Sequence, residues 1–226
     1  MIKAVIFDLD NTLIDFMQMK ENSCRAAVQA MIAAGLKMSE DKAYNRLMQT
    51  YLNVGIESNR AFTLFLKSIR QFDHKILAAG INAYLKAKTD FVKPYPNVEQ
   101  VLKELKNKGI ALSIVTDAPK TKAYQRLLLM GIEPFFDFVI GHEDTRKAKN
   151  TGLPLKLALE QLRKVSPNIK NSEILMVGDS VERDLTPAKQ LGLRTAFASY
   201  GRITVEESIS DYELRSIMDL IRKIEV

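Results

Sequence analysis

Short runs of apolar residues recur along the chain, and turn-forming residues bound each of them. Continuous apolar runs of this length are typical of strands in a parallel sheet, because helices cover both faces of such a sheet. Between the runs, apolar residues recur at intervals of three and four, which predicts helices with one buried face. The predicted strands comprise residues 4–7, 110–115, 136–140, 174–177 and 195–198.

Three of the predicted helices end in the same way, with a glycine directly before an apolar run. These glycines are Gly109, Gly131 and Gly192. Glycine readily adopts the left-handed backbone that closes a helix before the chain turns back toward a sheet. The alternation of strands and helices therefore predicts a doubly wound, Rossmann-like α/β domain with a parallel sheet.

The segment from residue 15 to residue 92 interrupts this alternation. It contains no strand pattern, only helical stripes such as Phe62, Phe65, Leu66 and Ile69. We interpret it as a small all-α helical-bundle cap domain, residues 15–92, inserted into an α/β core formed by residues 1–14 and 93–226. The sequence Lys93-Pro94-Tyr95-Pro96 disfavours helix and marks the return to the core. The alternative is that these helices pack on the sheet within a single domain.

The composition narrows the classes of protein to consider. A chain of 226 residues with 46% hydrophobic residues can bury a large core. Cys24 is the single cysteine, so we expect no internal disulfide and a reducing, cytoplasmic location. No segment approaches the roughly 18 apolar residues of a membrane span, so we expect no membrane partner. The net charge of +6 is interleaved with acidic residues, which indicates a solvated surface and no nucleic-acid partner.

Acidic and hydroxyl side chains follow three of the predicted strands. Ligands of an open α/β sheet bind beyond the carboxyl ends of its strands, so we expect these side chains to lie close together. One such aspartate alone would be typical of a helix cap, but their joint occurrence indicates a site. Crowded carboxylates repel one another, and a hard divalent ion such as Mg²⁺ would relieve the repulsion. The residues are Asp8, Asp10 and Thr12 after the first strand, Thr116 and Asp117 after the second, and Asp179, Ser180 and Asp184 after the fourth.

Four short motifs, in this order, resemble those of the haloacid dehalogenase (HAD) superfamily of hydrolases. The first is D-x-D-x-T, which spans residues 8–12, and the second is an apolar strand that ends in a hydroxyl residue, Thr116. The third is a lysine ahead of a helix, and the fourth is G-D-x-x-x-x-D, residues 178–184. The resemblance extends from residue 5 to about residue 198. It is closest to the phosphatases that carry a helical cap after the first motif, subfamily I.

Two positions depart from the family pattern. Relatives commonly have Lys-Pro at the third motif, whereas this chain reads Arg-Lys-Ala-Lys-Asn over residues 146–150. Counting back from the following helix selects Lys149, with Lys147 as the alternative. Asn11 stands where many relatives carry glycine, and asparagine also tolerates an unusual turn backbone.

The resemblance implies a role for each residue of the predicted site. Asp8 would be the nucleophile that forms an aspartyl-phosphate, and Asp10 would be the general acid and base. Mg²⁺ would be held by the carboxylate of Asp8, the backbone carbonyl of Asp10 and the side chain of Asp179. The remaining residues would bind the substrate phosphate or orient the metal-bound water and the lysine. Thr12, Thr116, Asp117 and Lys149 belong to the phosphate-binding set, with Thr116 and Lys149 also assisting catalysis, and Ser180 and Asp184 to the orienting set.

The substrate implied by the resemblance is a small soluble phosphomonoester, such as a sugar phosphate, phosphoglycolate or a nucleotide. One alternative is a 2-haloacid dehalogenase, but that branch expels halide and typically lacks the second aspartate, Asp10. Another alternative is a non-catalytic binding or regulatory protein with the same fold. The pattern does not distinguish a monomer from a homodimer.

Overall fold

A computed structural model describes residues 1–201 and 209–224 of the chain. It divides into two compact units. Unit 1 combines Met1–Asp15 with Lys93–Val226, and unit 2 is the continuous segment Phe16–Val92. Unit 1 therefore contains every residue of the predicted site.

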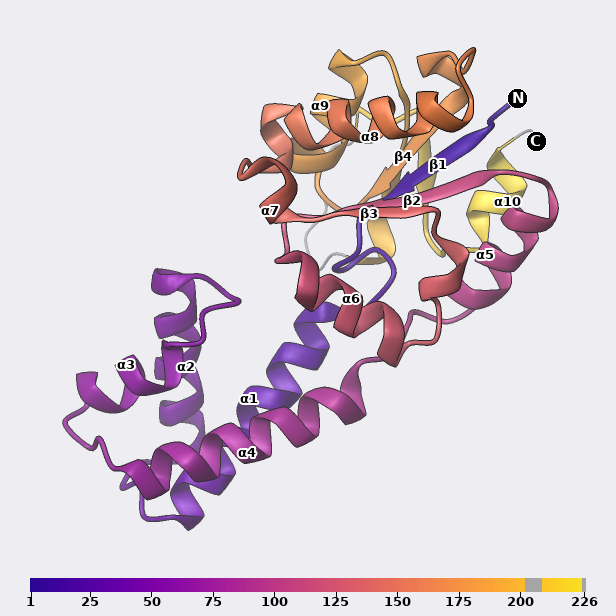
Figure 1. Ribbon diagram of the computed structural model, residues 1–226. Helices are drawn as coiled ribbons and strands as arrows, with labels where there is room; N and C mark the ends of the chain where they lie inside the picture. Colours follow the sequence, from indigo (N-terminus) through magenta and orange to yellow (C-terminus); the bar gives the residue numbers. More distant parts are fainter. Residues whose placement is uncertain (202–208, 225–226) are drawn as a thin grey trace. The chain divides into compact units, whose positions relative to one another are not determined.

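A parallel sheet of six strands forms the centre of unit 1, in the order β3-β2-β1-β4-β5-β6 (Figure 1). The predicted α/β class with a parallel sheet is confirmed. Five of the strands coincide with the predicted apolar runs to within two residues at either end, and the sixth was not predicted. The strands are β1 (Ala4–Phe7), β2 (Ala111–Val115), β3 (Phe138–Ile140), β4 (Ile174–Gly178), β5 (Arg194–Ala198) and β6 (Tyr212–Leu214).

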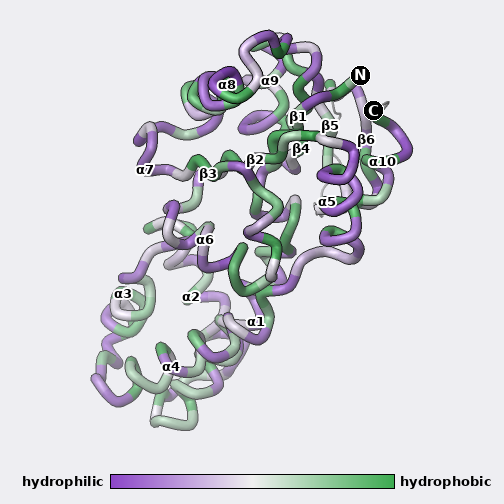
Figure 2. Tube along the Cα trace, turned by 45° about the vertical axis from the view of Figure 1, so that its right-hand side comes forward, coloured by the Kyte–Doolittle hydropathy of each residue, from purple (hydrophilic) through white to green (hydrophobic). Residues whose placement is uncertain are grey.

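Helices cover both faces of this sheet, with α8 and α9 on one face and α5 and α10 on the other (Figure 1). All four residues of β1 are fully buried. Figure 2 shows the hydrophobic colour along the central strands. The helices of unit 1 are α5 (Val98–Asn107), α6 (Lys120–Leu129), α7 (His142–Thr145), α8 (Leu153–Val165), α9 (Thr186–Gln190) and α10 (Asp219–Lys223).

The glycines predicted to close helices adopt the left-handed backbone. The φ angles are 74° at Gly109, 70° at Gly131 and 75° at Gly192. Each glycine ends a helix and releases the chain toward the next strand or turn of the core. These positions fix the short connections that bring successive strands into one sheet.

Unit 2 consists of four helices, α1 (Phe16–Ala33), α2 (Glu40–Val54), α3 (Ala61–Ser68) and α4 (His74–Phe91). Its apolar stripes pack together as predicted, with Phe65 and Leu47 fully buried and Ile69 at the edge of the cluster. Cys24 is buried there as a free thiol. No helix in the described part of the chain combines the length and apolarity needed to cross a membrane. The function of unit 2 as a cap stays a prediction.

Candidate active site

The order of the strands explains where the site forms. The chain builds the sheet from β1 outward to β3 on one side and from β4 outward to β6 on the other. β1 and β4 are neighbours, with Phe7 aligned with Val177. Asp8 directly follows β1, and Asp179 directly follows β4, so both carboxylates reach the crevice at which the strand order reverses.

Three carboxylates meet at this point. One oxygen each of Asp8, Asp179 and Asp184 lies within 4.8 Å of the other two. All three residues are buried, with Asp184 fully so. Burial weakens the screening of their charges by water, so the group needs positive charge to be stable.

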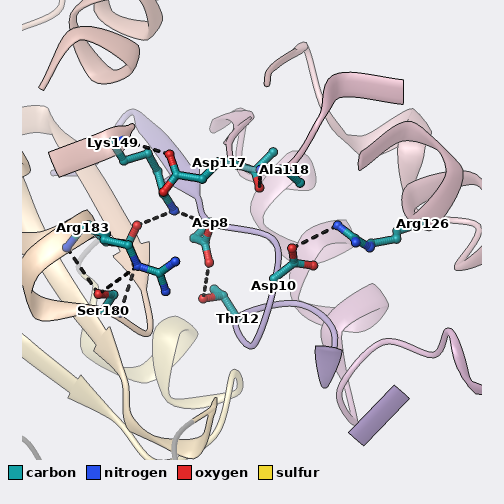
Figure 3. A network of polar contacts seen from close by, with 11 residues as sticks. Asp8, Asp10, Thr12, Asp117, Ala118, Arg126, Lys149, Ser180 and Arg183 are labelled. Carbon is teal, nitrogen blue, oxygen red and sulfur yellow. Dashed lines mark hydrogen bonds and ion pairs between the residues drawn. The ribbon is translucent and has the colours of Figure 1, made fainter. Parts of the chain in front are cut away.

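Lys149 supplies part of that charge. Its Nζ forms ion pairs with a carboxylate oxygen of Asp8 and, at 2.5 Å, with Oδ1 of Asp184. Figure 3 shows the amine directed into the group of carboxylates. Lys149 is buried, whereas Lys147 is exposed, so the structure places the first lysine and not the second in the site. The backbone of Lys149 is also held in place, because its N–H donates a hydrogen bond to Oδ1 of Asp117 at 2.8 Å.

The lysine and its partner are electrostatically coupled. Burial alone would lower the pKa of Lys149, but the carboxylates of Asp184 and Asp8 raise it well above its usual range. Burial raises the pKa of Asp184, and Lys149 opposes that rise. Lys149 is therefore a permanent cation at neutral pH, and the neighbouring carboxylates depend on it.

The turn after β4 positions Asp184. This turn is a π-helix, Val181–Leu185, preceded by Ser180. The backbone N–H of Ser180 donates a hydrogen bond to Oδ2 of Asp184 at 3.0 Å, which fixes the start of the turn. Gly178 makes room for this contact. A Cβ at that position would lie 2.5 Å from the Asp184 side chain. The glycine of the fourth motif is thus required by the close packing of β4 against Asp184.

Asp10 has a different environment from the other acidic residues. Asn11 adopts a left-handed backbone with φ of 60°, and the loop turns the Asp10 carboxylate away from Asp8 toward Arg126 of α6 (Figure 3). Nη1 of Arg126 donates to Oδ2 of Asp10 at 3.0 Å. Burial raises the pKa of Asp10 to about 6, although Arg126 opposes the rise.

Two hydroxyl residues of the predicted set also reach the site. Thr12 is fully buried, and its Oγ1 lies 3.4 Å from Oδ2 of Asp8 as a hydrogen-bond donor. Thr116 is buried at the end of β2, where its Oγ1 accepts a hydrogen bond from the N–H of Ala118 at 3.1 Å. The hydroxyl proton of Thr116 is therefore free to point elsewhere.

A second segment holds the loop of the first motif in place. The hydroxyl of Tyr200 donates to the backbone oxygen of Thr12 at 2.7 Å. Its ring packs edge-on against that of Tyr95, with centroids 5.1 Å apart. Gly201 passes so close to this loop that a Cβ there would overlap the carbonyl oxygen of Asn11. The Asp10 loop is thus fixed by the chain after β5 as well as by its own turn.

The donor set suits a hard divalent cation. The three carboxylates of the cluster face the ammonium group of Lys149 and the nearby guanidinium group of Arg183, which still leaves net negative charge in a buried space. Oxygen ligands of this kind are the ones that Mg²⁺ takes in proteins, whereas soft metals prefer sulfur or imidazole. Asp8 and Asp179 are the side chains that would hold such an ion, because each directly follows one of the two neighbouring strands β1 and β4.

Sequence reasoning missed Arg126, Tyr200 and Gly201. Arg126 carried a readable signal, since it stands three residues after Ala123 and one before Leu127, on the buried stripe of its helix. Tyr200 and Gly201 carried none, because only the fold brings them to the first motif. The side chain of Asp117 accepts a hydrogen bond from the backbone N–H of Lys149, and its role in substrate binding stays a prediction.

Known proteins resemble this chain over nearly its whole length. The model of the haloacid dehalogenase-like hydrolase family matches residues 2–192. The chain belongs to this family. A relative from Methanocaldococcus jannaschii, named glyceraldehyde 3-phosphate phosphatase, is 34% identical over 98% of this chain and 96% of its own length. Phosphoglycolate phosphatase of Neisseria gonorrhoeae is 31% identical over 88% of this chain and 81% of its own length.

A solved structure also shares the fold of this HAD-like hydrolase. It is that of YfnB of Bacillus subtilis, bound to magnesium, which is 20% identical in sequence. The two structures match over 100% of this chain and 99% of the YfnB chain, with a TM-score of 0.73. The predicted family is confirmed. Since the named relatives are phosphatases, the prediction of a hydrolase that acts on phosphate esters is confirmed as well.

Proposed function

We propose that this HAD-like hydrolase is a Mg²⁺-dependent phosphatase that hydrolyses a small phosphomonoester through an aspartyl-phosphate on Asp8. The convergence of Asp8, Asp179 and Asp184 on one buried point, with Lys149 among them, is the observation that carries the proposal. Asp8 and Asp179, with the backbone carbonyl of Asp10, would hold the ion. When bound, Mg²⁺ neutralises the excess negative charge and polarises phosphoryl oxygens.

Asp8 is suited to act as the nucleophile. Its carboxylate follows the central strand, at the crevice where ligands of this fold bind. Thr12 and Lys149 both contact the carboxylate and restrict its rotation. In the first step an oxygen of Asp8 bonds to phosphorus while the bond to the leaving oxygen breaks. The positive charge of Lys149 stabilises the phosphoryl oxygens, and the hydroxyl of Thr116 can donate to them.

Asp10 is suited to move the proton. A leaving alkoxide needs a proton as its bond to phosphorus breaks, and the water of the second step must lose one. An acid with a pKa near neutral pH serves both steps, and the pKa of Asp10 is raised to about 6. Water then cleaves the bond between Asp8 and phosphorus, which releases inorganic phosphate and restores both carboxyl groups.

The names of the relatives suggest which phosphomonoesters to assay first. Relatives 34% and 31% identical to this chain are named for glyceraldehyde 3-phosphate and for phosphoglycolate. Both compounds are short phosphorylated chains with a polar carbonyl or carboxyl group. We propose a substrate of this class, with specificity set by unit 2 acting as a cap.

The test is a phosphate-release assay on these two compounds and on p-nitrophenyl phosphate, with Mg²⁺ and with EDTA. We expect turnover with Mg²⁺ and its loss in EDTA. Asp8→Asn should abolish turnover, because an amide is a poor nucleophile, and should leave the circular dichroism spectrum unchanged. Asp41→Asn is the matched control, since Asp41 is 87% exposed on unit 2. Acid quenching of a turning-over sample should leave a phosphoryl group on the peptide that contains Asp8. Normal turnover by Asp8→Asn would refute the proposal.

A further inference from the structure

Arg126 is a fully buried arginine in the core unit. It lies in α6, and 1% of its side chain is exposed. Ala123 and Leu127, its neighbours on the same face of the helix, are fully buried as well. A guanidinium group stays charged at any pH of interest, so burying it is costly unless its N–H groups are paired. An apolar residue would fill this position of the helix at lower cost.

The position of Arg126 makes sense if its charge is needed at Asp10. Its Nη1 donates to Oδ2 of Asp10 at 3.0 Å, across 116 residues of sequence. Figure 3 shows the two side chains directed toward each other and away from the Lys149 cluster. Two different cations are therefore paired with the two aspartates of the first motif, Lys149 with Asp8 and Arg126 with Asp10.

The two oxygens of the Asp10 carboxylate are not equivalent. Oδ2 accepts the hydrogen bond from Arg126. Oδ1 is shielded from solvent and accepts no hydrogen bond from any residue that the structure describes. A buried polar atom without a partner is uncommon and often marks a place where a ligand or water binds. The side chain as a whole is 24% exposed, so the carboxylate is close to the surface of unit 1.

We propose that Arg126 is a positioning residue for Asp10, holding Oδ2 so that Oδ1 is the atom that exchanges the proton with the substrate. This inference rests on the phosphatase activity proposed above. An oxygen that accepts from a guanidinium group has its lone pair turned to that donor, so a proton on the carboxyl group resides on the other oxygen. The hydrogen bond from Arg126 thereby fixes the orientation of the Asp10 carboxyl group and determines which of its oxygens carries the proton.

The proton and electron balance of the step is simple. As Asp8 bonds to phosphorus, the ester P–O bond breaks and its electron pair stays on the leaving oxygen. The proton on Oδ1 of Asp10 passes to that oxygen and yields the alcohol. In the second step Oδ1 takes a proton from the attacking water, so the carboxyl group is protonated again when phosphate leaves. Arg126 keeps its charge throughout, because its guanidinium group stays protonated.

The inference predicts an effect that depends on the leaving group. An alkyl phosphate releases a basic alkoxide and needs the acid, whereas p-nitrophenyl phosphate releases a stable anion and needs it little. Arg126→Lys keeps the charge but cannot keep the planar geometry of the guanidinium group. We expect the rate of the first step, measured in a single turnover with Mg²⁺, to fall roughly 10- to 100-fold for an alkyl phosphate and less than about threefold for the aryl ester. KM should change little for either substrate.

A double variant separates positioning from a structural role. If Arg126 acts through Asp10, then in the Asp10→Asn background the change Arg126→Lys should have no further effect on the alkyl ester. Arg126→Met, which leaves Asp10 without its donor, should lose more than Arg126→Lys on the same substrate. Circular dichroism checks that each variant is folded. If Arg126→Met does not fold, the results for Arg126→Lys alone decide whether Arg126 acts through Asp10. Arg163→Lys, an exposed arginine of α8, is the matched control.

The outcomes separate this inference from the proposed function. Equal losses on the aryl and alkyl esters, multiplying with the loss from Asp10→Asn, would make Arg126 a structural residue and overturn the inference while the phosphatase activity stands. A wild-type protein that hydrolyses neither ester with Mg²⁺ would overturn the proposed function and this inference with it. A selective loss on the alkyl ester, absent in the Asp10→Asn background, supports the inference.

Discussion

Replacing Lys149 with methionine is the sharpest test of the electrostatics of the site. The change keeps most of the side-chain volume and removes the cation that lies between Asp8 and Asp184. Removing one partner of a buried ion pair leaves the other charge uncompensated, which costs about 3–5 kcal/mol. We therefore expect the free energy of unfolding of unit 1 to fall by about this amount, out of a total of about 5–15 kcal/mol for a typical domain.

Native-state hydrogen exchange can measure this loss of stability in unit 1 separately from unit 2. The backbone amides of β1 and β4 are buried in the sheet of unit 1, so their exchange does not report on the helices of unit 2. The expected loss corresponds to roughly 200- to 5,000-fold faster exchange of the slowest of these amides. Lys147→Met is the matched control, because Lys147 is exposed two residues away, and its effect should stay within about 0.5 kcal/mol.

The loss should also depend on pH with a defined sign. Burial raises the pKa of Asp184 to about 7 even with Lys149 in place, so without the lysine it rises further. A raised carboxyl pKa means that the folded state takes up protons, and the cost of the buried charge is fully present only above that pKa. The difference between variant and wild type should therefore shrink as the pH falls from about 8.5 toward 7. A loss below about 1 kcal/mol, or one that is the same at both pH values, would refute this account of the site.

Three further predictions concern the loop of the first motif. Gly201→Ala should lower kcat roughly tenfold or more, since the new Cβ overlaps the carbonyl oxygen of Asn11 and displaces the loop that carries Asp10, the proposed general acid. Tyr200→Phe, which removes only the hydrogen bond to Thr12, should cost about 1 kcal/mol of stability. A Gly201→Ala enzyme with the wild-type kcat would show that the position of the Asp10 loop does not depend on the chain after β5. In metal-free protein, the pKa of Asp10 rises from 3.8 to about 6 on folding, so its charge destabilises the protein above about pH 6 and not below pH 3.8. Relative to Asp10→Asn, the wild type should gain up to about 3 kcal/mol between pH 7 and pH 4, measured by urea unfolding in EDTA, and a flat difference would show that burial does not raise this pKa.

The apolar runs were enough to predict five strands because these strands are buried on both faces. β4 illustrates this, since all five of its residues are buried and no polar residue interrupts the pattern. β6 could not be predicted in the same way. It has three residues at the edge of the sheet, and its middle residue, Glu213, is exposed, so the segment has no run of apolar residues to recognise.

The motif residues of the site could be predicted for a related reason. Asp8, Thr116 and Asp179 directly follow recognisable strands, and the rule for parallel sheets gathers such residues at one edge. Lys149 was placed instead by its spacing from the helix that follows it. Arg126 and Tyr200 do not follow this rule, because they reach the site from a helix and from the segment after β5. Their roles depend on which faces pack together, and that information is spread over the whole fold. The choice between Lys149 and Lys147 was open in the sequence for the same reason, and in the structure only Lys149 of the two is buried beside Asp8 and Asp184.

The order in which the strands of unit 1 follow one another along the chain has a consequence for its folding during synthesis. β1 lies in the middle of the sheet, where Ala4 is paired with Ala111 on one side and with Ile174 on the other. β1 is made before both of its neighbours, so it is paired on both sides only after β4 has been made, whereas the helices of Phe16–Val92 pack against one another. Asp8 is made before β4, yet the carboxylates around it come together only when β4 and the turn after it have been made.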